Sequence, residues 1–173
     1  MTEVILTLNS LKKRIKDFRN CHINFIPTMG NLHFGHESLV RKAIKKRGIS
    51  IVSIFINPLQ FSETFDFKRY PKSLDADLEL LKSLGVDYIL LPKKSFLKRD
   101  LYNTNISVGN ISNLLCGKDR PGHFDGVATI IVKFLNIIRP KSIFLGEKDF
   151  QQVLVIKKLI KDLNYSTRVI THK

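Results

Sequence analysis

The segment INFIPTMGNLHFGHESLVRKAI, residues 23–44, decides the fold of this 173-residue chain. It begins with the apolar run Ile23–Ile26, which predicts a buried strand, and it ends in Ser38–Ile44, which predicts a helix. Between them lies a turn that contains two glycines and two histidines, His33 and His36. The free backbone N–H groups and the dipole of a helix N-terminus bind anions. We therefore expect a phosphate site at this strand–helix junction, with both imidazoles directed at the same bound group.

The remaining apolar segments alternate between strand and helix patterns. Strands are expected at Ile49–Ile56, Val86–Leu91, Ser142–Leu145 and Arg168–Ile170, with a further short strand near Ile106–Val108 in an otherwise irregular segment, 93–122. Helices are expected at Leu8–Phe18, about Gly35–Lys46, Ser73–Leu84, Gly126–Ile138 and Asp149–Leu163. This alternation predicts an α/β fold with a parallel, doubly wound sheet, and we interpret residues 1–173 as a single nucleotide-binding domain.

Composition narrows the class of protein. No apolar run approaches the roughly 20 residues of a membrane helix, and the first residues do not form a signal peptide, so no membrane partner is expected. Cys21 and Cys116 stand far apart, which indicates reduced thiols in a cytoplasmic protein. The net charge of +14 permits nucleic-acid binding. The lysines are scattered over expected helix faces, however, which favours a solvated surface and no nucleic-acid partner.

Three polar loops follow expected strands and should meet at one edge of the sheet. They are Pro27–His36, Asn57–Phe61 and Gly146–Gln152. Lysine after a strand-end glycine favours a phosphate contact for Lys148, whereas Asp149 is equally well explained as a helix cap. The amides of Asn57, Gln60 and Gln152 can orient a polar substrate without adding charge.

Three further residues have uncertain roles on their sequence context alone. Arg120, in a loop before the apolar helix, is either an anion ligand or a surface residue. Tyr70 belongs to a turn by default. Asp77 lies in the first turn of a helix, where acids are favoured in any case, so a magnesium role is the weaker interpretation.

Several motifs, in one order along the chain, resemble those of the pantothenate synthetase (pantoate–β-alanine ligase) family. The His-x-Gly-His element alone would indicate only the wider Rossmann-like nucleotidyltransferase superfamily. The combination is far more specific, and the resembling segments are Ile26–Gly30, Leu32–His33, Gly35–His36, Val52–Phe61, Arg69–Pro71, Ala76–Leu78, Arg120–Phe124, Gly126–Thr129 and Phe144–Gln152.

The resemblance implies a two-step reaction in which ATP, with Mg²⁺, activates pantoate as pantoyl adenylate and β-alanine then displaces AMP. It implies His33, His36 and Lys148 as catalytic residues. ATP would be bound by Met29, Gly30, His33, Gly35, His36, Gly146, Glu147, Lys148 and Asp149. Pantoate and β-alanine would lie against Gln60 and Gln152, supported by Asn57, Tyr70, Arg120 and His123, with Asp77 as the candidate metal ligand. A homodimer is also implied.

The chain departs from the family pattern in two residues and in length. Asn31 stands where alanine is usual, and Phe150 where tyrosine is usual. The family continues into a second ATP loop and a smaller C-terminal lid domain, so we expect a truncated N-terminal domain with weak or absent turnover alone. Two alternatives remain open: another His-x-Gly-His nucleotidyltransferase that acts on a phosphate-bearing substrate, and a basic nucleic-acid-binding module.

Overall fold

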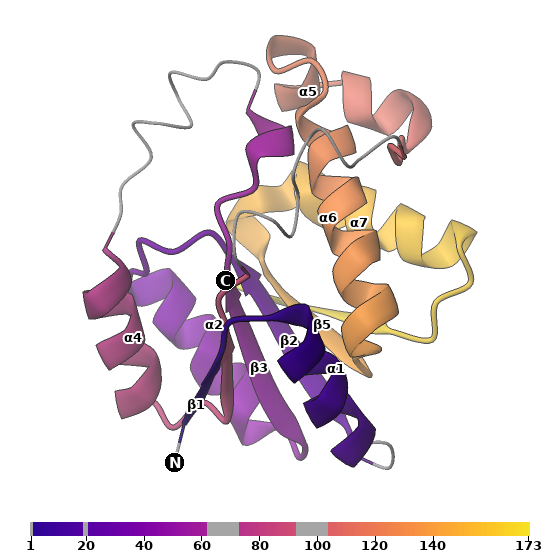
Figure 1. Cartoon of the computed structure of the whole chain (residues 1–173). Helices are drawn as coiled ribbons and strands as arrows, with labels where there is room; N and C mark the ends of the chain where they lie inside the picture. The colour runs from indigo at the N-terminus through magenta and orange to yellow at the C-terminus, as the bar shows by residue number, and fades with distance from the viewer. Residues whose placement is uncertain (1, 19–20, 62–72, 93–103) are drawn as a thin grey trace.

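The computed structural model describes residues 2–18, 21–61, 73–92 and 104–173, and Figure 1 shows their arrangement. Within these residues, a six-stranded sheet pairs every strand in parallel. This sheet confirms the expected α/β class. Its strands are β1 (Glu3–Ile5), β2 (Ile23–Thr28), β3 (Ile49–Ile54), β4 (Tyr88–Leu90), β5 (Ser142–Gly146) and β6 (Arg168–His172).

The strand order β1-β4-β3-β2-β5-β6 determines where a ligand can bind. From β2 the chain adds β3 and β4 on one side, then returns past β2 and adds β5 and β6 on the other side. The direction of the crossovers therefore reverses between β2 and β5. In open parallel sheets, ligands bind at such a reversal, outside the carboxyl ends of the strands. The loops that follow β2 and β5 both start at this point.

Helices cover both faces of the sheet, which confirms the doubly wound arrangement. The longer helices are α1 (Leu8–Asp17), α2 (Phe34–Lys45), α4 (Leu74–Ser83), α6 (His123–Ile138) and α7 (Phe150–Asp162). Shorter helical segments are η1 (Pro58–Gln60), η4 (Gly109–Asn113), α5 (Cys116–Asp119) and η5 (Glu147–Asp149). The helices α2 and α4 pack on one face, while α1, α6 and α7 pack on the other. Figure 1 shows α2 behind the sheet and α1 and α6 in front of it.

The central strands are mostly apolar because both of their faces are buried. Successive side chains of a strand point to opposite faces. On β2, Ile26 belongs to the core under α2 and α4, whereas Phe25 belongs to the core under α1, α6 and α7. On β3, Val52 and Ile51 divide in the same way. All four side chains have 0% exposed surface, as expected for a parallel sheet covered on both faces.

The structure corrects several expected elements. The strand expected near Ile106–Val108 is wrong, because these residues form no strand and their first N–H donates to the Thr129 hydroxyl at 3.0 Å. Helix α6 begins at His123 rather than at Gly126, and β3 ends at Ile54, two residues before its expected end. The short edge strand β1 was not expected. The segment expected to be irregular contains η4 and α5.

A glycine in α6 allows the segment after β3 to approach the helix closely. A Cβ atom at Gly126 would overlap the backbone of Leu59 and Gln60. The Gly126 carbonyl also accepts a hydrogen bond of 3.0 Å from the Asn57 amide. The absence of a side chain at this position therefore brings η1 and its polar residues to the carboxyl edge of the sheet.

The variant Gly126→Ala should destabilise the chain by about 1–3 kcal/mol, because the added methyl group forces η1 away from α6. Glycine-to-alanine changes inside helices ordinarily stabilise by about 0.5–1 kcal/mol, so the expected sign is reversed. The matched control is Gly146→Ala, where φ is −71° and the nearest atom to an added Cβ is 3.9 Å away. Urea denaturation of both variants tests this, and a stabilised Gly126→Ala would contradict it.

Candidate functional site

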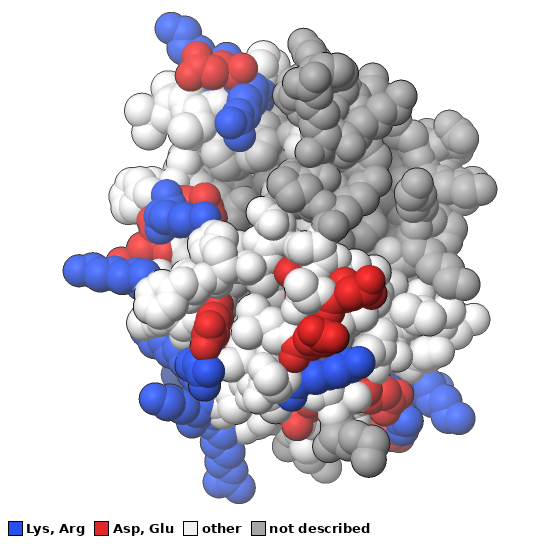
Figure 2. Space-filling model, turned by 90° about the vertical axis from the view of Figure 1, so that its left-hand side faces the viewer, with Lys and Arg blue, Asp and Glu red and all other residues white. Residues whose placement is uncertain are grey.

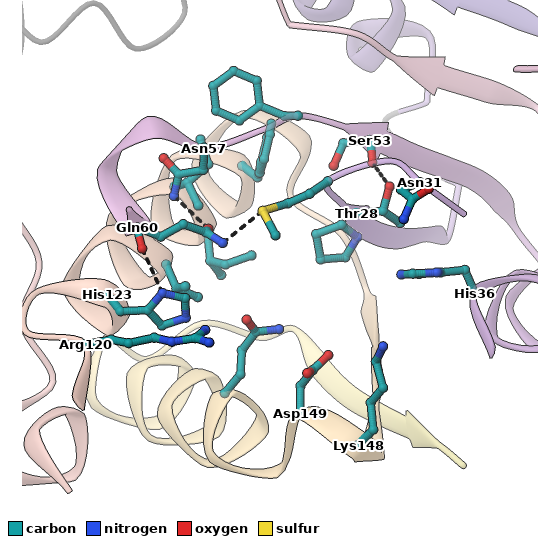
Figure 3. A pocket seen from close by; sticks show the side chains of 18 of the residues that line it. Thr28, Asn31, His36, Ser53, Asn57, Gln60, Arg120, His123, Lys148 and Asp149 are labelled. Carbon is teal, nitrogen blue, oxygen red and sulfur yellow. Dashed lines mark hydrogen bonds between the residues drawn. The ribbon is translucent and has the colours of Figure 1, made fainter. Parts of the chain in front are cut away.

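A cavity of about 380 Å³ lies at the carboxyl ends of the central strands (Figure 3). The loops after β2 and β5, the segment after β3 and the start of α6 form its walls. Ten of the residues that the sequence singled out line this cavity together: Met29, His33, His36, Asn57, Gln60, Arg120, His123, Lys148, Asp149 and Gln152. The cavity therefore occupies the point where the strand order reverses.

The loop after β2 takes an unusual backbone path that a buried carboxylate stabilises. Gly30 and Asn31 have φ values of +82° and +53°, which glycine and asparagine tolerate best. Asp77, only 3% exposed on α4, accepts hydrogen bonds of 2.8 Å from the N–H groups of Asn31 and of Leu32. The Ser73 hydroxyl donates to the same carboxylate at 3.2 Å. The loop is therefore held in position by a residue that lies 46 and 45 positions away from Asn31 and Leu32 in the sequence.

These contacts bear on the expected magnesium role of Asp77. Both carboxylate oxygens already accept hydrogen bonds from the protein. In the part of the chain that the structure describes, no group of three or more His, Cys, Asp or Glu side chains could hold a metal ion. The geometry around Asp77 therefore favours anchoring of the loop over metal binding.

His33 and His36 form the N-terminal cap of α2. The His33 Nδ1 accepts from the Gly35 N–H at 3.1 Å, and the His36 Nδ1 accepts from the His33 N–H at 3.3 Å. The two rings lie 4.2 Å apart between centroids. Because the His36 Nδ1 is an acceptor, the neutral ring carries its proton on Nε2. Figure 3 shows the His36 ring directed into the cavity, where this N–H is available to a ligand.

Lys148 joins the loop after β5 to the loop after β2. Its Nζ lies 3.2 Å from the His33 Nε2. The other ring nitrogen of His33 already faces the Gly35 N–H. A neutral imidazole has one acceptor nitrogen, so His33 can accept from only one of these two donors at a time. When His33 accepts from the Gly35 N–H, the ammonium group of Lys148 has no acceptor in His33 and can donate to a bound anion instead.

Two cavity histidines, His36 and His123, are held neutral by their surroundings. Burial lowers the pKa of His36 to about 4, and the nearby His33 and Lys148 act in the same direction. Burial is also the main cause that lowers the pKa of His123, with the charge of Arg120 adding to it. Near neutral pH, these two imidazoles are therefore uncharged, and they offer N–H groups and lone pairs to a ligand.

The segment after β3 presents a chain of linked amides. The Asn57 amide donates to the Gln60 side-chain oxygen at 3.1 Å, and the Gln60 amide donates to the Met29 sulfur at 2.9 Å. The His123 Nδ1–H donates to the Gln60 carbonyl at 2.8 Å. These contacts tie the loops after β2 and β3 to α6 (Figure 3). The amides are thereby fixed before any ligand enters.

An apolar wall faces these polar groups, and sequence reasoning missed its role. The sequence assigned the helix here to the core, and its residues are indeed buried. One face of α6 nevertheless lines the cavity, together with a side chain after β3: Phe55, Val127, Ile130, Ile131 and Phe134. The spacing of the four α6 residues at i, i+3, i+4 and i+7 could have indicated this face, because it continues the line of His123.

The remaining expected residues, and the expected helix cap, take other positions. Glu147 accepts a hydrogen bond of 2.8 Å from the Thr171 hydroxyl, so its carboxylate is directed toward β6. Asp149 occupies the N-cap position of α7, but its side chain makes no capping hydrogen bond and lines the cavity. Tyr70 lies outside the described residues. Three glycines belong to the loops without lining the cavity: Gly30, Gly35 and Gly146.

A second, larger cavity of about 710 Å³ lies at the opposite edge of the sheet, between α1 and the end of α6. Its lining includes four cations: Lys12, Lys16, Arg139 and Lys141. Helix C-termini carry partial negative charge and favour cations nearby. Lys16 lies in the last turn of α1, and Arg139 and Lys141 follow α6 directly. Helix electrostatics therefore account for three of these four cations without a ligand.

The comparisons with known proteins agree with this geometry. The family model for pantoate-beta-alanine ligase matches residues 3–173. The chain belongs to the pantoate-beta-alanine ligase family. The pantothenate synthetase of Acetivibrio thermocellus is 45% identical over 170 residues, which cover 97% of this chain and 60% of that protein. The pantothenate synthetase of Caldicellulosiruptor saccharolyticus is 47% identical over 148 residues, 86% of this chain and 53% of that protein.

Solved structures of this family share the fold. Pantothenate synthetase from Thermus thermophilus superposes with a TM-score of 0.92 at 35% identity, covering 98% of this chain and 61% of that one. Pantoate-beta-alanine ligase from Francisella tularensis, complexed with beta-gamma ATP and beta-alanine, superposes with a TM-score of 0.95 at 38% identity. The superposition covers 99% of this chain and 67% of the Francisella tularensis chain. The chain thus spans 53% and 60% of the length of the two curated relatives named above.

The variant Asp77→Asn should destabilise the chain by about 1–3 kcal/mol, because the new amide group faces a loop N–H in a buried site. The amide resonances of Asn31 and Leu32 should shift most in a ¹H–¹⁵N spectrum. The matched control is Asp75→Asn, which changes an exposed acid on the same helical turn and should stay within about 0.5 kcal/mol. Equal effects of the two variants would refute the anchoring role.

His36 should titrate with a midpoint near pH 4, followed through its ring proton by NMR. The unfolded chain takes up this proton near pH 6.5, so between pH 6.5 and 4 the unfolded state binds more protons. The contribution of neutral His36 to stability is therefore present above pH 6.5, falls as the pH drops to 4 and is constant below. Lys148→Met should raise the midpoint. A His36 midpoint near 6.5 would contradict this electrostatic account.

Proposed function

We propose that this chain supplies the ATP- and pantoate-binding part of an enzyme that condenses pantoate with β-alanine. The products would be pantothenate, AMP and pyrophosphate, formed through pantoyl adenylate. The observation that supports this most is the meeting of Lys148, His33 and His36, from two separate loops, at the reversal of the sheet. The family membership of residues 3–173 supports the same reaction.

In the first step of the proposed reaction, a carboxylate oxygen of pantoate attacks the α-phosphorus of ATP. The new O–P bond forms as the bond to pyrophosphate breaks. Negative charge accumulates on the phosphoryl oxygens, and fixed donors and cations stabilise it. In the second step, the amine of β-alanine attacks the acyl carbon, loses a proton and displaces AMP.

The phosphate end of the proposed site is the corner formed by the two loops. The ammonium group of Lys148 would contact the phosphate oxygens, which would replace His33 as its partner. The neutral His36 would donate from Nε2. The free N–H groups at the start of α2 add the partial positive charge of a helix N-terminus. Mg²⁺ would enter bound to the phosphate oxygens, which it prefers as ligands. Asp149, an acidic residue in the described cavity wall, would offer a carboxylate near this ion.

The acyl end of the proposed site combines amides with an apolar wall. Pantoate is a branched acid with two methyl groups on one carbon and two hydroxyl groups. The methyl groups suit the wall of Phe55 and α6, and the hydroxyl groups suit the amides of Gln60 and Gln152. A phosphorylated acceptor would call for more cations than Arg120 supplies at this end. Pantoate therefore fits better than the substrate of another nucleotidyltransferase.

A nucleic-acid-binding role has less support. The face of the molecule that includes α4 carries acidic and basic side chains side by side (Figure 2). A polyanion-binding surface is expected to be predominantly basic.

Among the described residues, no helix is long and apolar enough to cross a bilayer. A homodimer stays part of the proposal, and light scattering would show twice the 19.9 kDa chain mass.

Isothermal titration tests the proposal on this chain. A non-hydrolysable ATP analogue should bind, and pantoate should then bind to the analogue-loaded chain, whereas glycerol 3-phosphate should not. Lys148→Met should weaken binding of the analogue about 10- to 100-fold, the loss expected for one charge-assisted contact. The matched control, Lys157→Met, removes an exposed lysine from the outside of α7. Preference for the phosphorylated acceptor over pantoate would overturn the proposal.

Turnover provides a second readout. AMP release dependent on β-alanine should be much slower for these 173 residues than for a full-length relative, because the relatives are longer by the part not matched here. Rates equal to those of the Acetivibrio thermocellus protein would show that these residues suffice for the whole reaction.

A further inference from the structure

The side chain of Gln151, in the first turn of α7, holds a neighbouring segment of the chain. It is only 7% exposed, and its amide group donates to two backbone carbonyls, that of Ile111 at 3.0 Å and that of Leu114 at 2.5 Å. Its amide oxygen is buried and unpaired in the described structure, which is costly. An apolar side chain would avoid this cost, so the two donated hydrogen bonds are what the glutamine contributes here.

The two carbonyls lie at the junction of η4 and α5. Ile111 belongs to η4, and the Leu114 carbonyl also accepts from the Gly117 N–H of α5 at 2.9 Å. The next residue, Leu115, has φ of +46° and ψ of −126°, a conformation that leucine adopts only with strain. Its side chain is 71% exposed, so packing does not compensate. The hydrogen bonds from Gln151 therefore stabilise a turn that is unfavourable on its own.

The short helix α5 carries a cavity residue at its end. It lies directly on η4, because a Cβ atom at Gly117 would overlap the Ser112 carbonyl. Arg120 follows α5 and lines the cavity, and Figure 3 shows its side chain reaching into the cavity below His123. Within the described residues, the Arg120 guanidinium group makes no hydrogen bond or ion pair. The position of this charge therefore follows from the backbone of α5.

We propose that Gln151 is a positioning residue, which sets the place of Arg120 in the cavity and thereby the affinity for the acid. This inference rests on the proposed function, because it takes pantoate as the acid bound beside Arg120. The next residue, Gln152, lines the cavity from the same helical turn. Because α7 directly follows the segment of Lys148, one helix sets the spacing between the phosphate corner and Arg120.

A double-mutant cycle tests the role of Gln151, by isothermal titration of pantoate into the chain loaded with the ATP analogue. Gln151→Met keeps the length of the side chain and removes both N–H donors. It should weaken pantoate binding about 3- to 10-fold in the wild-type background and less than about 2-fold in Arg120→Met, because its effect passes through the guanidinium group. Binding of the ATP analogue to Gln151→Met should change less than about 2-fold, because Lys148 keeps its place.

The matched control is Val153→Ala, which truncates a side chain of α7 that is 4% exposed and does not line the cavity. It should lower the midpoint of thermal unfolding and leave pantoate binding unchanged. Gln151→Asn, a milder second variant whose amide is one methylene shorter, should show the pattern of Gln151→Met at smaller amplitude. Unchanged pantoate binding in Gln151→Met would overturn the inference. Equal weakening in both backgrounds would overturn it as well, since the effect would then not pass through Arg120.

The side-chain Nε–H resonance of Arg120 gives a readout that needs no substrate. In the ligand-free chain, it should shift in Gln151→Met and stay in place in Val153→Ala. An unchanged resonance in Gln151→Met would overturn the positioning role. If the wild-type chain binds no pantoate while this resonance shifts, the proposed function fails and the effect of Gln151 on Arg120 stands, so the two results are distinguishable.

Discussion

The buried carboxylate of Asp77 makes the contact on which the site depends. It accepts hydrogen bonds from two consecutive N–H groups, those of Asn31 and Leu32, and thereby ties α4 to the loop after β2. The loop then caps α2 with His33 and presents His36 to the cavity. Without this contact, the two backbone N–H groups would lack an acceptor and the left-handed turn at Gly30 would lose its support. The position of both imidazoles therefore depends on one buried side chain on another element.

The sheet supplies the second constraint. Because the strand order reverses between β2 and β5, the loops after these strands diverge and leave a cavity between them. Lys148 spans this divide to His33, and the amides after β3 line the adjoining wall. Gly126 allows α6 to approach that wall closely enough to contribute apolar side chains. Polar and apolar surfaces thus face each other in a shape suited to a small branched acid beside a phosphate.

The sequence predicted the elements whose signals are local. The buried strands β2 and β3 are rich in apolar and β-branched residues, and glycine or proline follows most of the longer helices, so the type and order of these elements could be predicted. The three-residue strand β1 was too short to give such a signal. Ile106 and Val108 are apolar because they pack against the core, and their alternation led to the wrong prediction of a strand. The cavity loops were predicted because they follow strands. The hydrogen bond between the Asn31 N–H and Asp77 was not predicted, because the two residues lie 46 positions apart in the sequence.

Chemical-shift mapping tests the central claim, that the loops after β2 and β5 form one phosphate site. A non-hydrolysable ATP analogue is added to ¹⁵N-labelled chain, and amide shifts are followed by NMR. Gly35 and His36 should shift together with Lys148 and Asp149, with a single dissociation constant. Shifts confined to the larger cavity, around Lys12, Lys16 and Lys141, would contradict the account. So would shifts in one of the two loops without the other.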